Sequence, residues 1–516
     1  MFNMSTMTRF AIKAIPLMSC AAMAMTAATF AAPVVRGPVR GPVHRGAPAL
    51  VHRAAGSGVT LYGGGATVPG IAFEGMQALT NNPGVSPFTK GTIFGQLLTT
   101  LDKGDALQYC QTGSGYGDGV LDGLNPPNGP CAALGASPTG FGIPSSAQSY
   151  ADFSSSDAVT QTIYSQLQNG PLASRGEFVQ VPYVAGSIAL FYNNSDLDGA
   201  AQLTITPATL CKIADGTITN WNQIPLNPAQ PTGGDYPSKP LTWVYRYDAG
   251  AATFSFGNYL SAQNPKGTAP SHCTKAQGYG LSGEYDPANN SKGARGGNGV
   301  LPAGLPEPPG FLAGNGNAGV IGCILATAGA SCYHADALAP AVGDGSIGYV
   351  EAANAQSYRN PSAGQDYADL YVKGSNGNFA TYDPIRNLPA AAKQITALGV
   401  NEVIAAPLSS GRPVPDVVPV TGSTGNCLGI VDPASYDNIV KGYPIIAVVY
   451  LEFTSAGNGV KVPDLQNLAQ LTDATYFPKS GITSVDKDTA TTGTTGFSEI
   501  KLPVNGISTI ASCIGA

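Results

Sequence analysis

Short apolar stretches, each followed by a loop rich in glycine or hydroxyl side chains, recur along the chain. Leu61-Tyr62 leads into Gly63–Pro69 (GGGATVP), where the glycines permit a tight turn and Pro69 suits the first turn of a helix. Trp243–Arg246 ends a strand-like run, and Tyr443–Phe453 has the length and apolar character of a buried strand. A helical pattern covers Val159–Leu167. The pattern predicts strands and helices whose connecting loops carry the polar chemistry.

The first 58 residues differ from the rest of the chain. Arg9 and Lys13 precede an apolar run over Ala14–Ala28 and small residues up to Ala32, which predicts a secretory signal peptide over residues 1–31. Cys20 suggests a lipoprotein cleavage site as an alternative, but it follows Lys13 too closely for an apolar core, so we favour a soluble exported protein. Residues 32–58 repeat an Arg-Gly-Pro-Val unit and predict an extended basic tail.

Length and charge narrow the possible functions. A chain of 516 residues predicts two domains or lobes. The first 58 residues hold six basic and no acidic residues, so the remainder has 20 basic against 32 acidic groups. An acidic body is a poor general binder of nucleic acid, and the tail suits either a solvated spacer or contact with an anionic surface. No later segment approaches the ~20 apolar residues of a membrane span.

Motifs typical of enzymes are absent from the sequence. It contains no G-x-S-x-G, H-E-x-x-H or G-K-[ST] motif, and two of its four histidines lie in the tail. Gly314–Gly319 matches G-x-G-x-x-G, but it follows the proline-rich stretch Leu305–Gly310 instead of a predicted strand, so we interpret the match as chance. No catalytic residue, cofactor or metal site is therefore predicted.

Three polar loops remain as candidate binding elements. Ser114 lies in the glycine-rich loop Gly113–Gly117, ahead of a possible helix that begins near Val120. Asp157 precedes the helical pattern and suits an N-terminal cap. Arg246 ends a strand and has Asp248 two residues later, an arrangement that suits either a surface ion pair or a guanidinium held for oxyanion recognition. Each loop alone has an ordinary structural explanation.

Taken in order, these stretches resemble the phosphate-binding proteins of bacterial phosphate-specific ABC transporters, and more closely their secreted DING-type branch. The similar segments span about residues 59–470 and comprise Gly63–Pro69, Gln111–Gly115, Asp152–Ala158, Gln180–Tyr192, Leu210–Ile224, Gly345–Glu351 and Gly442–Ile445. Leu210–Ile224, which contains Gly216–Ile224 (GTITNWNQI), is the most specific match. Co-occurrence in the family's order makes the resemblance strong.

The resemblance implies a two-lobed α/β fold of the periplasmic binding protein type (type II), with a ligand closed between discontinuous lobes. Lobe 1 is expected to contain residues 59–183 plus 443–516, and lobe 2 residues 184–442. Two strands, Val181–Tyr192 and Gly442–Leu451, are expected to cross between the lobes. Inserts over about 119–148 and 274–316 have no predicted function.

The resemblance also implies the ligand contacts. Thr67, Val68, Ser114, Asp157 and Arg246 would bind phosphate, with Asp248 holding Arg246 in place. An ionised Asp157 would accept the proton that phosphate carries and would repel sulfate, which carries none. The following loop departs from the family, because Gly250 and Ala252 stand where its hydroxyls would be, so that Gly250, Ala251 and Ala252 would bind the ligand through backbone N–H groups alone. Two lost bonds to a charged group would cost about 3–6 kcal/mol, so hydroxyls restored at 250 and 252 are expected to tighten binding.

Eight cysteines remain once Cys20 leaves with the signal peptide, and an even number in an exported protein suggests disulfides. Zinc is disfavoured because no C-x-x-C occurs. Sequence alone permits 105 pairings of eight cysteines. The resemblance implies Cys211–Cys273; short separation favours Cys110–Cys131 and Cys323–Cys332, which leaves Cys427–Cys513.

The resulting hypothesis is an exported phosphate-binding protein, located in the periplasm or outside the cell, that delivers phosphate to an ABC permease or scavenges it. A secreted interaction or adhesion protein with a degenerate anion site is the main alternative, and a phosphoester hydrolase is a weaker one. The sequence leaves the affinity, the permease partner and the oligomeric state open.

Overall fold

The structure is a computed structural model, and it describes most of the chain beyond the predicted tail. The described residues are 58–100, 104–121, 131, 140–157, 173–197, 202–226, 236–247, 250–263, 307–335, 337–373, 377–393, 395, 427, 429, 431, 436, 439–472, 477, 481–487, 492–500 and 510–515. The predicted signal peptide and the helix predicted over Val159–Leu167 lie outside them.

Helices and strands alternate along much of the described chain. The α-helices are α1 (Gly70–Glu74), α2 (Ile93–Thr100), α3 (Ser114–Leu121), α5 (Pro207–Ala214), α6 (Ala251–Ala262), α8 (Gly316–Leu325), α9 (Ala352–Gln356), α10 (Leu388–Ala392) and α11 (Val462–Gln470). The strands are β1 (Thr60–Gly65), β2 (Gly84–Val85), β3 (Ala106–Gln111), β4 (Phe153–Ser156), β5 (Phe178–Asn193), β6 (Thr204–Ile205), β7 (Thr242–Arg246), β8 (Phe311–Gly314), β9 (Cys332–His334), β10 (Ala337–Ala339), β11 (Ser346–Glu351), β12 (Gln365–Lys373), β13 (Phe379–Tyr382), β14 (Ile446–Thr454) and β15 (Phe497–Glu499).

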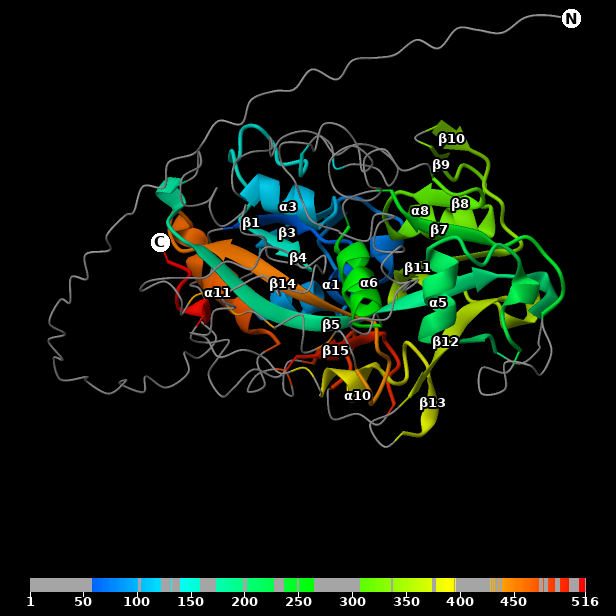
Figure 1. The fold of residues 1–516 in the computed structure, drawn as a ribbon. Coiled ribbons are helices and arrows are strands. Elements are labelled where there is room, and N and C mark those ends of the chain that lie inside the picture. Colours follow the sequence, from blue (N-terminus) through cyan, green and yellow to red (C-terminus); the bar gives the residue numbers. More distant parts are fainter. Residues whose placement is uncertain are drawn as a thin grey trace, which may run out of the picture. The chain divides into compact units, whose positions relative to one another are not determined.

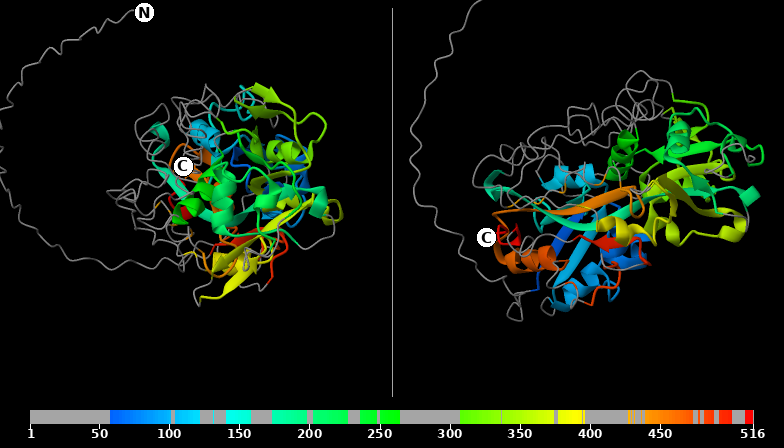
Figure 2. Two further views of the ribbon diagram at one scale, coloured as in Figure 1. Left: turned by 45° about the vertical axis from the view of Figure 1, so that its right-hand side comes forward. Right: turned by 60° about the horizontal axis from the view of Figure 1, so that its bottom comes forward.

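One long strand joins two groups of strands (Figure 1). All sixteen residues of β5 are buried. Its residues 178–187 pair with β14, and residues 188–193 pair with β11. We call β2, β3, β1, β4 and β14 the first sheet half, and β10, β9, β8, β7 and β11 the second sheet half. The right-hand view in Figure 2 shows β14 in orange running beside β5 in teal.

Parallel strands form the centre of each sheet half. In the first half, β1 lies between β3 and β4 and is parallel to both. In the second half, β7 lies between β8 and β11 and is parallel to both. Parallel strands need cover on both faces, and β7 and β11 are accordingly buried along their whole length. The carboxyl ends of neighbouring parallel strands therefore meet at one edge of each half.

Local sequence explains several helix starts. Pro69 directly precedes α1, and its carbonyl oxygen accepts from Phe73 N at 2.9 Å, as the glycine-rich turn predicts. Thr206 caps α5 by accepting from Thr209 N, with Pro207 at the first helical position. Within the most specific family-like segment, Trp221 is buried and its indole N–H donates to the Gly345 carbonyl at 2.8 Å.

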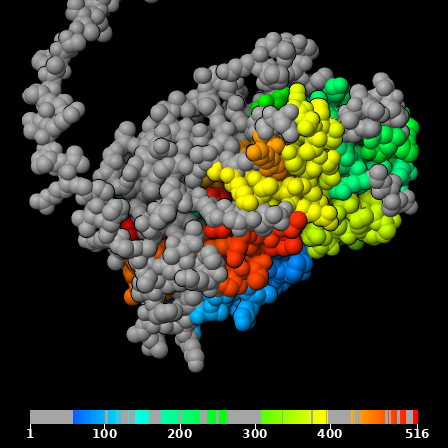
Figure 3. All heavy atoms as spheres, turned by 90° about the horizontal axis from the view of Figure 1, so that it is seen from below, coloured from blue at the N-terminus to red at the C-terminus, as the bar shows by residue number. Residues whose placement is uncertain are grey.

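The described residues of the C-terminal segment 481–500 contact three separate parts of the chain. Thr483 N donates to the Gly91 carbonyl of the first part of the chain, while Gly493 N donates to the Arg386 carbonyl ahead of α10. Between these contacts, β15 pairs with residues 184–186 of β5. Figure 3 shows this segment in orange-red between residues 377–393 in yellow and the early chain in blue. How the chain divides into lobes at residues 183 and 443 stays a prediction.

No helix within the described ranges is long and apolar enough to cross a lipid bilayer.

Candidate functional site

Three predicted site residues follow the carboxyl ends of adjacent strands in the first sheet half. Thr67 lies in the turn between β1 and α1, Ser114 begins α3 after β3, and Asp157 follows β4 directly. All three side chains are buried, and that of Asp157 is 1% exposed. The helix expected to begin near Val120 instead begins at Ser114, since Gly117 N already donates to the Gly113 carbonyl. The order β4–β1–β3 brings the three residues to one edge.

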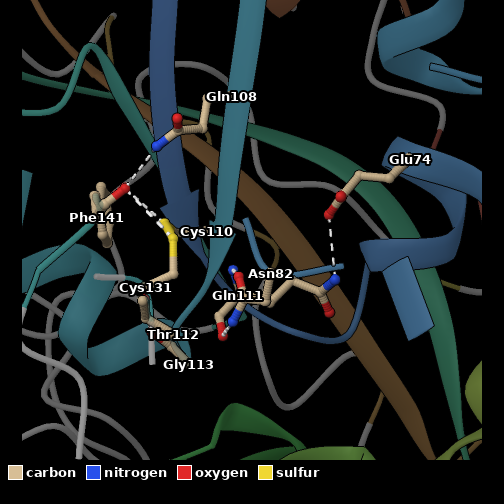
Figure 4. The surroundings of a disulfide bond; sticks show 9 residues. All are labelled: Glu74, Asn82, Gln108, Cys110, Gln111, Thr112, Gly113, Cys131 and Phe141. Atoms are coloured by element: carbon tan, nitrogen blue, oxygen red, sulfur yellow. Dashed lines mark hydrogen bonds between the residues drawn. A yellow bond between two sulfur atoms is a disulfide. The ribbon is translucent and has the colours of Figure 1, made fainter. Parts of the chain in front are cut away.

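The loop that carries Ser114 is fixed by contacts at the end of β3 (Figure 4). The disulfide Cys110–Cys131 ties the end of β3 to the following segment. Gln111 donates from its side chain to the Ala78 carbonyl at 2.8 Å, and its backbone N–H donates to Asn82 Oδ1 at 3.0 Å. Thr112 N and Gly113 N both donate to the carbonyl at the end of β1. The start of α3 is therefore held against the end of β1.

The second sheet half also places polar side chains at its carboxyl edge. Arg246 is the last residue of β7, Glu351 is the last residue of β11, and Asn317 lies in the first turn of α8 after β8. Arg246 is 1% exposed, and its Nη1 donates to Asn317 Oδ1 at 3.3 Å. Its backbone N–H donates to Tyr349 Oη at 3.2 Å. The predicted cation is thus buried and oriented by its neighbours.

The loop after Arg246 leads into α6, which begins at Ala251. Ala252 is fully buried, and Thr253 Oγ1 shares a hydrogen bond with Tyr349 Oη at 2.8 Å, so that hydroxyl is directed at the tyrosine. Gly250 lies against Arg246, because a Cβ built there would stand 2.3 Å from Nη2. Val68 is buried against Gly186 of β5. Asp248, expected to hold Arg246, lies outside the described residues.

Two interactions join the edges of the two sheet halves. Asn317 Nδ2 donates to Thr67 Oγ1 at 3.4 Å, although the residues are 250 positions apart. The guanidinium of Arg246 interacts electrostatically with the carboxyl of Asp157 and lowers its pKa. The structure therefore brings Thr67, Asp157 and Arg246 to one place, as the resemblance implies for a ligand site.

Buried carboxyl groups dominate the electrostatics of this place. Burial raises the pKa of Asp157 to about 8, the Arg246 guanidinium opposes the rise, and Glu452 adds to it. Burial likewise raises the pKa of Glu351 to about 8, although N–H donors from Ala353 and Asn354 lower it. Neither carboxyl oxygen of Asp157 has a hydrogen-bond partner within the described part of the chain. A group in this state needs either a proton or a donor from a ligand.

A pH dependence of stability follows for the unliganded protein. Because the pKa of Asp157 is 3.8 ordinarily and about 8 when folded, the folded state holds this proton more tightly than the unfolded state. The resulting stabilisation is complete below about pH 4 and is lost as the pH rises through about 8. Asp157→Asn is therefore expected to raise the melting temperature by several degrees at pH 9 and little at pH 5, measured calorimetrically without anions. An equal change at both pH values would contradict this.

Sequence reasoning missed Asn317 because it misjudged the run Gly314–Gly319. The stretch does follow a strand, β8, and it opens helix α8, so the expectation that no strand precedes it is wrong. Gly314 and Gly319 pack closely, since a Cβ at Gly314 would lie 2.4 Å from the Gly319 carbonyl carbon. The glycines therefore serve close packing of strand and helix. The repeated Gly-Asn pairs, Gly314-Asn315 and Gly316-Asn317, were the available signal.

The disulfides agree with the expected pairs as far as the structure describes them. Cys110–Cys131, Cys323–Cys332 and Cys427–Cys513 are formed. Cys211 is also disulfide-bonded, while Cys273 lies outside the described residues. Among the described positions, no three His, Cys, Asp or Glu side chains are grouped so as to hold a metal ion.

Known proteins resemble this chain in sequence. The PBP superfamily domain matches residues 101–404, more than half of the chain. The phosphate-binding protein PstS2 of Mycobacterium bovis is 30% identical over 125 residues, which are 24% of this chain and 33% of that protein. Alkaline phosphatase L of Pseudomonas aeruginosa is 34% identical over 87 residues, 17% of this chain and 20% of that protein. The chain thus matches a third or less of the length of these curated relatives.

A solved structure resembles it in fold. The high-affinity periplasmic phosphate-binding protein PfluDING, solved with phosphate bound, superposes with a TM-score of 0.50 at 21% identity, over 88% of this chain and 93% of that one. This likeness confirms the predicted fold class, with mixed strands and helices in two lobes. The chain belongs to the PBP superfamily.

Proposed function

We propose that the protein is an exported solute-binding protein that binds inorganic phosphate where the carboxyl edges of the two sheet halves meet. The main supporting observation is that a buried guanidinium, Arg246, acts electrostatically on a buried carboxyl, Asp157. The oxygens of this carboxyl have no hydrogen-bond partner among the described residues. A guanidinium binds an oxyanion through two parallel bonds. Phosphate can accept the proton of a neutral Asp157 or donate its own proton to an ionised one, so one ligand serves both groups.

The surrounding groups supply neutral donors. The Thr67 and Ser114 hydroxyls and the Val68 N–H come from the first sheet half. On the other side, the twelve-residue helix α6 begins at Ala251, and its first backbone N–H groups, from residues 250–252, favour an anion. Phosphate is also what PstS2 and PfluDING bind according to their names. Asp248 completes the proposed set by orienting Arg246.

The biological role that fits is phosphate capture outside the cytoplasm. The predicted signal peptide over residues 1–31 supports export to the periplasm or the cell exterior. Delivery to an ABC permease and extracellular scavenging both suit this site. We propose binding without catalysis, because the PBP superfamily match covers most of the body, whereas the phosphatase likeness covers 17% of the chain.

Calorimetry on the mature protein in phosphate-free buffer tests the proposal. We expect one phosphate per chain with a dissociation constant well below 1 mM, and sulfate binding more weakly above pH 8, where Asp157 is ionised. No heat of binding at millimolar phosphate would overturn the proposal and favour the secreted interaction protein. Release of p-nitrophenol from p-nitrophenyl phosphate by purified protein would instead point to the hydrolase.

Gly250 provides a prediction that differs from the sequence-based expectation. A hydroxyl added at this position was expected to tighten phosphate binding, but any Cβ at 250 would stand 2.3 Å from Arg246 Nη2 and 2.5 Å from Cζ. Gly250→Ala is therefore expected to displace the guanidinium and weaken phosphate binding about tenfold or more, measured by calorimetry.

The control for Gly250→Ala is the double variant with Arg246→Ala. If the glycine acts through Arg246, the double variant binds no more weakly than Arg246→Ala alone. Additive losses would show that Gly250 affects binding by another route. Ala252 is fully buried, so a larger side chain there overpacks the start of α6.

A further inference from the structure

Asn317 lies between Thr67 and Arg246, two proposed ligand-binding residues that belong to opposite sheet halves. In the pairing of β7 with β8, Gly314 lies opposite Arg246, so the chain passes beside the guanidinium as it enters α8. Asn317 follows three residues later and is 3% exposed. A buried asparagine must satisfy both ends of its amide.

Three contacts fix the orientation of this amide. Oδ1 accepts from Arg246 Nη1 and from Glu351 N, both at 3.3 Å. Nδ2 donates to Thr67 Oγ1 at 3.4 Å. Because two donors meet Oδ1, the amide nitrogen is directed at Thr67. The partners come from β7, from β11 and, across the sheet halves, from the turn after β1.

These contacts have a consequence for the two ligand-binding groups. A threonine hydroxyl has one hydrogen and can accept through its lone pairs. Since Thr67 Oγ1 accepts from Asn317, its own hydrogen is left to be donated elsewhere. Arg246 Nη1 is drawn to Asn317 Oδ1, which sets the plane of the guanidinium.

We propose that Asn317 is a positioning residue that orients the Thr67 hydroxyl and the Arg246 guanidinium together and holds the two sheet halves in the binding-competent arrangement. This inference rests on the proposed function for its ligand. Alanine at 317 leaves both groups without this partner. Aspartate keeps the acceptor for Arg246, loses the donor to Thr67 and adds negative charge beside the anion.

The first test measures phosphate affinity by calorimetry. Asn317→Ala is expected to weaken binding about 10- to 100-fold, and Asn317→Asp to weaken it further. The matched control is Asn315→Ala, because Asn315 is half-buried two residues earlier and makes no side-chain capping bond to α8. The control is expected to bind within about twofold of the unmodified protein. Equal affinities for unmodified protein and Asn317→Ala overturn the inference.

The second test needs no phosphate. Hydrogen–deuterium exchange of residues 66–74 and 250–254 is expected to accelerate in Asn317→Ala, at an unchanged melting temperature, and not in Asn315→Ala. Thr67→Val removes the same link from the other side, so it is expected to show the same change even if a variant at 317 fails to fold. Unchanged exchange in both variants overturns the inference.

The two tests also separate this inference from the proposed function. If the unmodified protein binds no phosphate, the proposed function fails, while the exchange measurement still decides whether Asn317 links the sheet halves. If phosphate binds and only the exchange changes, Asn317 is a structural link without influence on the ligand, and the positioning role is wrong.

Discussion

Replacing Arg246 by alanine is expected to weaken phosphate binding by at least about a hundredfold, because two charge-assisted hydrogen bonds contribute about 3 kcal/mol or more. The guanidinium is buried and donates to Asn317, while the backbone N–H of the same arginine donates to Tyr349 Oη, so little reorganisation precedes binding. Its loss also removes the charge that lowers the pKa of Asp157. Calorimetry with phosphate and with sulfate is expected to show the loss for both anions.

Two variants control for folding and for geometry. Arg246→Lys keeps the charge without the planar fork, so we expect intermediate affinity. Arg175 is a second buried arginine, which donates to the Ala151 carbonyl and to Asn458 Oδ1, both at 2.9 Å. Arg175→Lys is expected to lower the melting temperature while phosphate still binds. If Arg246→Ala keeps its affinity, the anion binds elsewhere and the site is wrongly placed.

Replacing Asp157 by asparagine is expected to remove the pH dependence of anion selectivity. The pKa of the unliganded carboxyl is about 8, so at neutral pH the carboxyl carries a proton that it can donate to sulfate as well as to phosphate. Above pH 8 sulfate must bind together with a proton, and its affinity is expected to fall about tenfold per pH unit. Dianionic phosphate still carries its own proton, so its affinity falls less.

The structure therefore refines the selectivity predicted from the sequence. An ionised Asp157 was expected to reject sulfate at any neutral pH, whereas burial postpones that rejection to alkaline pH. Asparagine donates at every pH, so the ratio of phosphate to sulfate affinity in Asp157→Asn is expected to stay constant from pH 8 to 10, where phosphate is a dianion throughout. Glu351→Gln is the control, because Glu351 has a similarly raised pKa but accepts from the backbone of α9. If sulfate binding by the unmodified protein does not depend on pH, Asp157 is not the group that supplies the proton for sulfate binding.

Much of the fold was predictable from local pattern. The strand-to-turn transition before Thr67 and the buried strand that became β14 both have sequence signals that depend on a few neighbouring residues. The polar side chains at the strand ends were predicted as well, since the family resemblance lies in those segments. Glycine, proline and runs of apolar residues act locally, which explains why such features can be read from one sequence.

Features that depend on tertiary contact were not predictable. Asn317 acts through Thr67, a residue 250 positions away. The strand that precedes Asn317, β8, has only four residues, and buried and exposed positions do not alternate along it. The raised pKa of Asp157 results from burial by several elements. Both features are set by packing between distant segments. The closeness of Gly250 to the guanidinium depends instead on the direction that the Arg246 side chain takes toward a residue four positions later.

The pairing of β5 with β14 has a consequence for biosynthesis. Strand β4 and the first part of β5 both take β14 as partner, and the Tyr183 hydroxyl donates to the Leu468 carbonyl across 285 residues. A nascent chain that has not reached residue 454 therefore presents an unpaired strand edge and cannot complete the body that holds Thr67 and Asp157. Late closure of this kind keeps the first sheet half open until residue 454 has been synthesised, which would suit the export proposed above.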